Sequence, residues 1–264
     1  MIPKKIHYCW LSGSKIPFNL MKCMKSWKEV MPEYEVVLWD RARFDTGSVR
    51  FVDEACRAGK WAFAADYIRA YALFSEGGVY MDSDVFVRKK FDSFLGYDFF
   101  TSVVYNTPVI DEFKTLEQLN PDGTSRIPSG HMPGFGIQAG VLGSVRGHPY
   151  LKDCMDYYKD RNFILDDGRY SMDLLASDIY AINAAKYGFR YINEVQHLDE
   201  NMLILPSSIF AGNLDEVNEN TYAIHYGAGS WLESDLRTKI RKVFERLRLD
   251  NTIRRLLGKP LKYR

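Results

Sequence analysis

The sequence predicts an α/β fold in which strands and helices alternate around a mainly parallel sheet. Three observations support it: β-rich runs at 5–10 and 35–40, helix-patterned segments after each of them, and an apolar run at 78–82 that follows a long helical stretch. Strands that are separated by helices in this way usually pair in parallel. In such sheets ligands bind beyond the carboxyl ends of the strands, where Asp40 and Asp82 fall.

The elements follow in order from the N-terminus. The run KIHYCW ends in the turn-like segment LSGSKIP, and residues 17–31 then carry an apolar stripe at helical spacing, made of Leu20, Met24, Trp27 and Met31. A second strand, EVVLWD, precedes helical material at 53–76 in two pieces and the strand GGVYMD. Further along, we expect strands at 101–110, 136–144 and 221–232, and helices at 148–159 and 172–187.

One connection in the second half is long. Residues 120–136, NPDGTSRIPSGHMPGFG, are rich in Gly, Pro and Ser and have neither a strand nor a helix pattern. Long connections without secondary structure are uncommon inside compact domains and are often functional. This segment is therefore a candidate active-site loop.

Composition limits the classes of function. At 264 residues the chain can bury one sizeable core, and its net charge of +1 gives no reason to propose nucleic acid as a partner. The four cysteines form no CxxC pair, which predicts reduced thiols in a cytoplasmic protein and no zinc site. The N-terminus lacks the apolar segment of a signal peptide, and no apolar run reaches the ~18 residues that span a bilayer.

Two carboxylates, Asp82 and Asp84, stand one residue apart at the end of the third strand. Side chains at i and i+2 of a strand point to the same face, so the two like charges favour a bound cation. Carboxylate oxygens suit Mg²⁺ or Mn²⁺, which complete their coordination with phosphates and water. A solvated turn at a strand end explains the tripeptide equally well.

The preceding helix adds a second charged pair. Asp66 and Arg69 are three residues apart and share one helix face, while almost every neighbour is apolar. An exposed pair of this kind is worth only ~0.2–0.5 kcal/mol. The apolar surroundings predict a buried pair instead, and burying it costs desolvation energy. The pair therefore points to a site.

Three segments, taken in sequence order, resemble motifs of one protein family. FAADYIRAYALFSEGGVYMDSDVFV resembles the DxD sugar-nucleotide signature of bacterial family 32 glycosyltransferases, relatives of the yeast α-1,6-mannosyltransferases and the clostridial glucosylating toxins. IPKKIHYCWLSG resembles the N-terminal strand of that family, and YAIHYGAGSW its C-terminal element. With GSVRGHPYL, the resemblance extends from residue 2 to about residue 232.

The resemblance implies a fold and an activity. It implies a single GT-A domain at 1–232, Rossmann-like with a mixed and mainly parallel sheet, followed by a helical tail at 233–264. A retaining enzyme of this kind moves a hexose or N-acetylhexosamine from a nucleotide-sugar, with Mn²⁺ or Mg²⁺. A UDP-sugar is the expected donor, and GDP-mannose is the alternative. The expected acceptor is a glycan or lipid-linked oligosaccharide in bacterial capsular or lipopolysaccharide synthesis.

The resemblance also assigns residues at the reacting centre. Asp84 binds the metal, Asp82 contacts the donor and the waters of the metal, and His225 lies close to the metal. Asp66 and Arg69 hold hydroxyls of the donor sugar and form the catalytic group with Asp82. A histidine satisfied inside the core is the alternative for His225.

Five further residues are assigned to the donor. His7 and Trp10 are placed near the nucleobase, Tyr80 on the strand before the acidic pair, and Ser230 and Trp231 on the diphosphate. Ordinary aromatic packing is the alternative for both tryptophans.

The chain departs from the family pattern in three segments. The resemblance therefore does not identify the residues that bind the acceptor. The segment GIQAGVLGS has Gln138 and Ala139 where relatives often have Asn, Tyr226 replaces a second His, and RYSMDLL replaces a Thr/Gly-Pro element. The acceptor candidates are Gln138, His131 and Asp173, each also explained by a structural role.

The C-terminal residues 237–264 are strongly basic. They contain eleven Lys or Arg and two acidic residues, with apolar residues at helical spacing. A basic amphipathic helix can lie on an anionic membrane, each cation contributing about 1 kcal/mol. We therefore expect a cytoplasmic protein that can sit on the inner face of the membrane. A helix packed on the domain is the alternative.

Two rival functions remain at this level. A phosphatase of the haloacid dehalogenase kind also uses DxD with Mg²⁺, but it carries Thr or Val where this chain has Phe86. A non-catalytic module that binds a sugar-nucleotide or a membrane is the other rival. Five intact polar positions argue against it: Asp66, Arg69, Asp82, Asp84 and His225.

Overall fold

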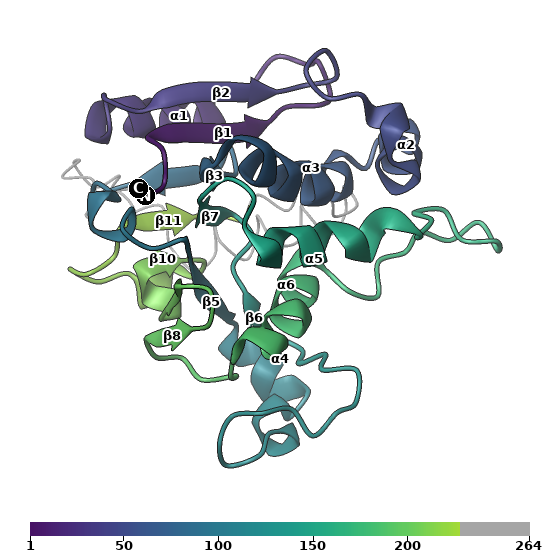
Figure 1. Cartoon of the computed structure of the whole chain (residues 1–264), viewed down its shortest axis with the longest axis vertical. Helices are drawn as coiled ribbons and strands as arrows, with labels where there is room; N and C mark the ends of the chain where they lie inside the picture. The colour runs from purple at the N-terminus through teal and green to yellow at the C-terminus, as the bar shows by residue number, and fades with distance from the viewer. Residues whose placement is uncertain (228–264) are drawn as a thin grey trace, which may run out of the picture. The chain divides into compact units, whose positions relative to one another are not determined.

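The alternation of strands and helices is present in the computed structural model, which describes residues 1–227. These residues form one unit built around a central sheet (Figure 1). The domain boundary expected at residue 232, the tail at 233–264, and Ser230 and Trp231 lie outside the described residues.

The central sheet is mixed and mainly parallel, as predicted. Its strands lie in the order β2 (Glu35–Trp39), β1 (Lys5–Cys9), β3 (Gly78–Met81), β7 (Val141–Ser144), β5 (Phe99–Tyr105), β9 (Met202–Leu205) and β8 (Gln196–Leu198). The pairings give β2, β1, β3, β5 and β9 one direction, and β7 and β8 the other. A further strand, β6 (Phe135–Ile137), pairs antiparallel with β5.

A second, small sheet lies next to the end of β3. It consists of β10 (Phe210–Ala211), β11 (Ala223–His225) and β4 (Val85–Val87), in that order. Because β4 follows β3 after a short turn, it links the two sheets at the point where β3 ends.

Helices cover both faces of the central sheet. They are α1 (Phe18–Val30), α2 (Arg50–Arg57), α3 (Trp61–Glu76), α4 (Thr107–Glu112), α5 (Pro149–Lys159) and α6 (Ala176–Ala184), with short 3₁₀ turns at Thr46–Ser48, Asp92–Phe94, Thr115–Gln118, Ala185–Tyr187, Ser207–Ile209 and Leu214–Glu216. One buried cluster joins α3, α5 and α6 to the sheet, and the other joins α1 and the small sheet to its opposite face.

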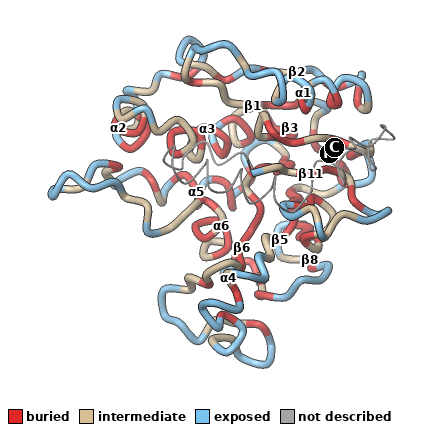
Figure 2. Tube along the Cα trace, turned by 180° about the vertical axis from the view of Figure 1, so that it is seen from behind, coloured by how far each residue is buried: buried red, intermediate tan, exposed pale blue. Residues whose placement is uncertain are grey.

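Strand alternation explains how β3 belongs to both clusters. Tyr80 packs in the cluster with α3, whereas Val79 and Met81 pack in the cluster with α1, because successive side chains point to opposite faces. Every residue of β3 is buried, which accounts for its continuous apolar sequence (Figure 2).

Two glycines make the tight turn from α3 into β3. Gly77 ends α3 at a φ of +66°, and its N–H donates to the carbonyl of Leu73. A Cβ on Gly78 would lie 2.9 Å from the carbonyl oxygen of Lys5 and 3.0 Å from Nε2 of His7. The turn therefore requires a backbone without side chains, as the pair GG predicts.

Some elements differ from the sequence expectations. β7 runs antiparallel between two parallel strands, the strand at 99–105 leads into α4, and β9 and β8 were not predicted. The helix expected at 172–187 is confined to α6 and a 3₁₀ turn. A membrane-spanning segment would need a longer and more apolar helix than any in the described part of the chain.

Candidate active site

Asp82 and Asp84 lie on the turn that connects β3 to β4. β3 ends at Met81, and the N–H of Val85 donates to the carbonyl of Asp82 at 3.0 Å. The N–H of Asp82 donates to the carbonyl of Gly140 at 2.9 Å, which ties the turn to the segment before β7. The two carboxylates converge because of this turn rather than because of strand alternation.

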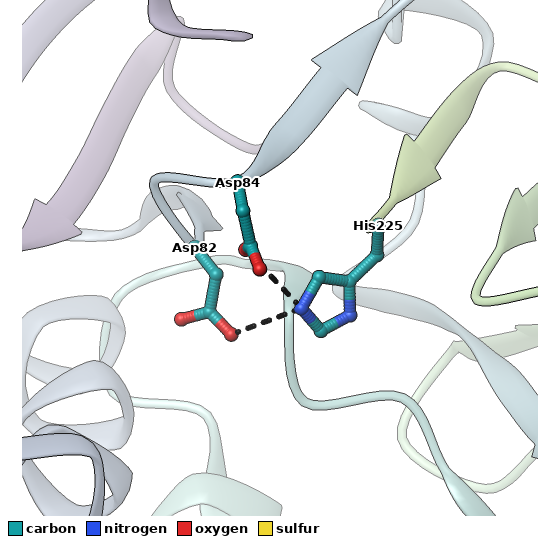
Figure 3. A group of neighbouring side chains, drawn as sticks. All are labelled: Asp82, Asp84 and His225. Carbon is teal, nitrogen blue, oxygen red and sulfur yellow. Dashed lines mark ion pairs between the residues drawn. The ribbon is translucent and has the colours of Figure 1, made fainter. Parts of the chain in front are cut away.

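His225 lies beside this turn and belongs to β11, the last described strand. It ends β11, which pairs antiparallel with β4 so that His225 lies opposite Val85. Nε2 of His225 is 3.3 Å from Oδ1 of Asp84 and 3.6 Å from Oδ2 of Asp82 (Figure 3). One ligand atom from each residue lies within 4.8 Å of the other two. Two carboxylates and an imidazole form a donor set that suits Mn²⁺.

The imidazole of His225 carries a charge in the absence of a metal. Burial lowers its pKa, but the carboxylates of Asp84 and Asp82 outweigh burial and raise the pKa to about 8. At neutral pH a proton therefore offsets part of the negative charge of the pair. A cation that binds here has to displace that proton.

Gly140 provides the space in which the His225 ring lies. A Cβ at Gly140 would come within 2.6 Å of Nδ1 and 2.7 Å of Cε1 of that ring. Gly140 was not predicted as a site residue from the sequence. It belongs to the segment GIQAGVLGS, which was noted there for its departure from the family pattern.

We expect the Gly140→Ala substitution to weaken Mn²⁺ binding about 10-fold, because the added methyl group displaces the ring of His225 and hence its ligand atom. Isothermal titration with Mn²⁺ measures the effect. Gly96→Ala is the matched control, since a Cβ there meets nothing within 4 Å. Equal affinity in the two variants would contradict the role assigned to Gly140.

Asp66 and Arg69 form a buried pair on α3 that reaches the acidic turn. Nη2 of Arg69 donates to Oδ1 of Asp66 at 2.8 Å, and Nη1 lies 3.6 Å from Oδ2 of Asp82. Nη1 also donates to the carbonyl of Ala139 at 2.6 Å. Only 5% of the Arg69 side chain is exposed, so the alternative of a surface ion pair does not hold.

The carboxyl group of Asp66 titrates near neutral pH. Burial raises its pKa, Arg69 lowers it, and the charge of Asp82 raises it again, to about 7 overall. Asp82 is held on its other side by Tyr80, whose hydroxyl donates to Oδ1 at 2.8 Å. Tyr80 thus contacts a predicted donor-binding residue from inside the core.

His7 is engaged on both ring nitrogens. Nε2–H donates to the carbonyl of Gly77 at 2.8 Å, and Nδ1 accepts from Nε1 of Trp39 at 3.0 Å. The ring is buried, which lowers its pKa. In this structure His7 ties β1 to the glycine turn and to β2, and its placement beside a nucleobase stays a prediction.

The remaining predicted residues are spread around the site. Trp10 follows β1 directly, is half-buried and donates from Nε1 to the carbonyl of Ser14 at 2.6 Å. Among the acceptor candidates, Gln138 is buried beside His225, whereas Asp173 is exposed. His131 lies 3.7 Å from Asp178, which caps α6 rather than facing the acidic turn.

Comparison with known proteins agrees with this geometry. Residues 17–101 match the family described as a glycosyltransferase sugar-binding region containing a DXD motif, a match that includes α3, β3 and the acidic turn. This region of the chain is thus similar to the DXD glycosyltransferases.

Two curated relatives of the chain are named as a mannosyltransferase and a glycosyltransferase. It is 27% identical over 154 residues to inositol phosphoceramide mannosyltransferase 3 of Schizosaccharomyces pombe, covering 57% of this chain and 35% of that protein. It is 29% identical over 106 residues to an uncharacterized glycosyltransferase of Acanthamoeba polyphaga mimivirus, covering 38% and 42%. The chain thus spans well under half the length of these curated relatives.

Solved structures similar to the chain are also named as glycosyltransferases. One is the galactosyltransferase LgtC in complex with donor and acceptor sugar analogues, at a TM-score of 0.45 and 14% identity over 89% of this chain and 94% of that one. Another is a glycosyltransferase involved in the glycosylation of the major capsid of PBCV-1, at a TM-score of 0.46 and 12% identity over 90% of this chain and 98% of that one.

Proposed function

We propose that the chain is a metal-dependent, retaining glycosyltransferase that moves a hexose or N-acetylhexosamine from a nucleotide-sugar, most simply a UDP-sugar, to a glycan or lipid-linked acceptor. The convergence of Asp82, Asp84 and His225 within 4.8 Å carries this proposal. These residues come from the turn after β3 and from β11, and the first two lie inside the matched family region.

The donor set fits a divalent cation. Asp84, Asp82 and His225 would hold Mn²⁺ or Mg²⁺, which when bound acts as a Lewis acid on the leaving nucleoside diphosphate. Phosphate and water would supply the remaining ligands that Mn²⁺ and Mg²⁺ usually take.

The other residues of the site position the donor sugar. Asp66 presents a carboxyl group whose ionisation is set by burial and by Arg69, and an anion at this point stabilises an oxocarbenium-like sugar. Arg69 directs its donors to Asp66 and to the carbonyl of Ala139, and so holds the Asp66 carboxylate in place.

Retention follows from reaction on one face of the sugar. The bond between C1 and the diphosphate oxygen breaks, the acceptor oxygen bonds to C1 on the same face, and the acceptor proton passes to the leaving phosphate. This route needs no nucleophilic carboxylate beneath C1. Trapping a covalent adduct between the sugar and a carboxylate of the Asp66→Asn variant would contradict it.

The setting of the reaction is part of the proposal. A cytoplasmic enzyme acting in bacterial capsular or lipopolysaccharide synthesis would meet lipid-linked acceptors at the inner face of the membrane. The basic sequence at 237–264 would favour that location through anionic lipids.

Nucleotide-sugars with Mn²⁺ are expected to raise the melting temperature of the protein, because a ligand that binds only the folded state stabilises it by mass action. A thermal-shift panel of UDP- and GDP-sugars, each with Mn²⁺ or with EDTA, measures this. The matching donor is expected to give a shift that EDTA removes. A panel without any metal-dependent shift would count against the proposed function.

A further inference from the structure

Gln138 is a buried side chain whose amide orientation is set by the backbone around it. Its Oε1 accepts from the N–H of Gly140 at 3.0 Å, and its Nε2 donates to the carbonyl of Phe210 at 3.2 Å. A peptide N–H can only donate and a peptide carbonyl can only accept. The two contacts therefore identify which end of the amide is oxygen, independently of His225.

The same oxygen contacts His225. Nδ1 of His225 lies 3.2 Å from Oε1 of Gln138. Since this oxygen offers only lone pairs, Nδ1 has to carry the hydrogen in a hydrogen bond between them. In the neutral ring Nε2 is then left with its lone pair, and Nε2 is the atom that faces Asp82 and Asp84.

The backbone of Gln138 is fixed as firmly as its side chain. Its N–H donates to the carbonyl of Ser102 at 2.8 Å, and its carbonyl accepts from Oγ1 of Thr101 at 3.0 Å. Both partners lie on β5 of the central sheet. The backbone that carries this oxygen is therefore bonded to β5.

We propose that Gln138 is a positioning residue for the metal centre: by accepting from Nδ1–H it selects the tautomer of His225 that presents an unprotonated Nε2 to a cation between Asp82 and Asp84. This inference rests on the role of His225 in the proposed function. Outer partners of this kind set the orientation and tautomer of metal-binding histidines. Gly140 makes room for the ring, and Gln138 determines which nitrogen is available.

The tautomer can be observed directly in the metal-free protein. Nitrogen NMR of ¹⁵N-histidine-labelled protein, in alkaline buffer where the ring is neutral, distinguishes protonated from unprotonated ring nitrogens. We expect His225 to be protonated at Nδ1, and the Gln138→Met variant to show a mixture of tautomers. Protonation of His225 at Nε2 in the unmodified chain would overturn the inference, whatever the enzyme transfers.

Metal affinity provides the second measurement. Gln138→Met is expected to weaken Mn²⁺ binding about 10- to 100-fold by titration calorimetry, as replacing such outer partners typically does. Gln138→Glu keeps an acceptor for Nδ1–H and is expected to recover part of that loss. If Gln138→Glu binds Mn²⁺ as weakly as Gln138→Met, the effect is one of packing and the inference fails.

A matched control separates local damage from the proposed role. Ser102→Ala alters the neighbouring strand at a hydroxyl that is buried and has no hydrogen-bond partner among the described residues. It is expected to bind Mn²⁺ as the unmodified chain does, and weaker binding would show that any change in this strand disturbs the site. Absence of Mn²⁺ binding by the unmodified chain would instead count against the proposed function, while the NMR result would still decide the tautomer.

Discussion

The Asp84→Asn substitution is expected to abolish metal-dependent donor binding and to lower sugar transfer by at least about 10²-fold, the scale that the loss of one electrostatic contributor at a transition state produces. Asp84 is largely buried, and one of its oxygens lies 3.3 Å from Nε2 of His225. Removing its charge leaves a single carboxylate and an imidazole, too few to hold the cation and the diphosphate together.

Two measurements examine this prediction. Mn²⁺ titration reports binding of the cation, and release of nucleoside diphosphate from the matching donor reports transfer. Asp156→Asn is the matched control, since it makes the same chemical change on an exposed carboxylate that pairs with Lys152 on α5. Sugar transfer by Asp84→Asn at the control rate would remove Asp84 from the mechanism.

Loss of Arg69 is expected to have the largest effect on stability. Arg69→Met leaves the buried carboxyl group of Asp66 without its partner and removes the bond to the carbonyl of Ala139. Breaking a buried ion pair from one side typically costs about 3–5 kcal/mol. Urea denaturation followed by circular dichroism measures the free energy of unfolding.

The loss of stability in the Arg69→Met variant is expected to depend on pH. The folded-state pKa of Asp66 is raised from 3.8 to about 7, so ionisation of Asp66 lowers stability as the pH rises through this range. Without Arg69, which lowers this pKa, the decline continues above about pH 7. The variant should therefore be closest to the unmodified chain in acid and furthest from it in alkaline buffer.

The control for Arg69 is another arginine in an ion pair. Arg43→Met removes a guanidinium that pairs with Glu76, but the Arg43 side chain is 42% exposed, and exposed pairs contribute about 0–1 kcal/mol. A similar loss in both variants, or a deficit of Arg69→Met that does not change with pH, would contradict the account of the Asp66–Arg69 pair.

The first half of the fold could be predicted because its patterns are local. The stripe containing Trp27 predicts α1, and the pair Gly77–Gly78 predicts the turn into β3. The position of β7 between β3 and β5 depends on pairing between segments far apart in sequence, which periodicity does not encode. β9 escaped prediction because four buried residues in a row fit a strand or part of a helix.

In the candidate site, too, local motifs could be predicted from the sequence and long-range contacts could not. Asp66, Arg69, Asp82, Asp84 and His225 have chemically distinctive side chains in recognisable motifs, and the structure brings them together. The contacts that hold them could not be found in this way, although Gln138 was already a candidate for binding the acceptor. The contacts of Gly140 and Gln138 with His225 exist only because β11 pairs with β4 beside the segment between β6 and β7, which carries both residues.

The antiparallel pairing of β11 with β4 has a consequence during protein synthesis. The two aspartates leave the ribosome early, while the histidine that lies beside them in the folded chain is the last residue of the last described strand. A chain that stops before β11 would keep both aspartates but lack His225, and the cation that we propose for this turn would lose one of its three ligands.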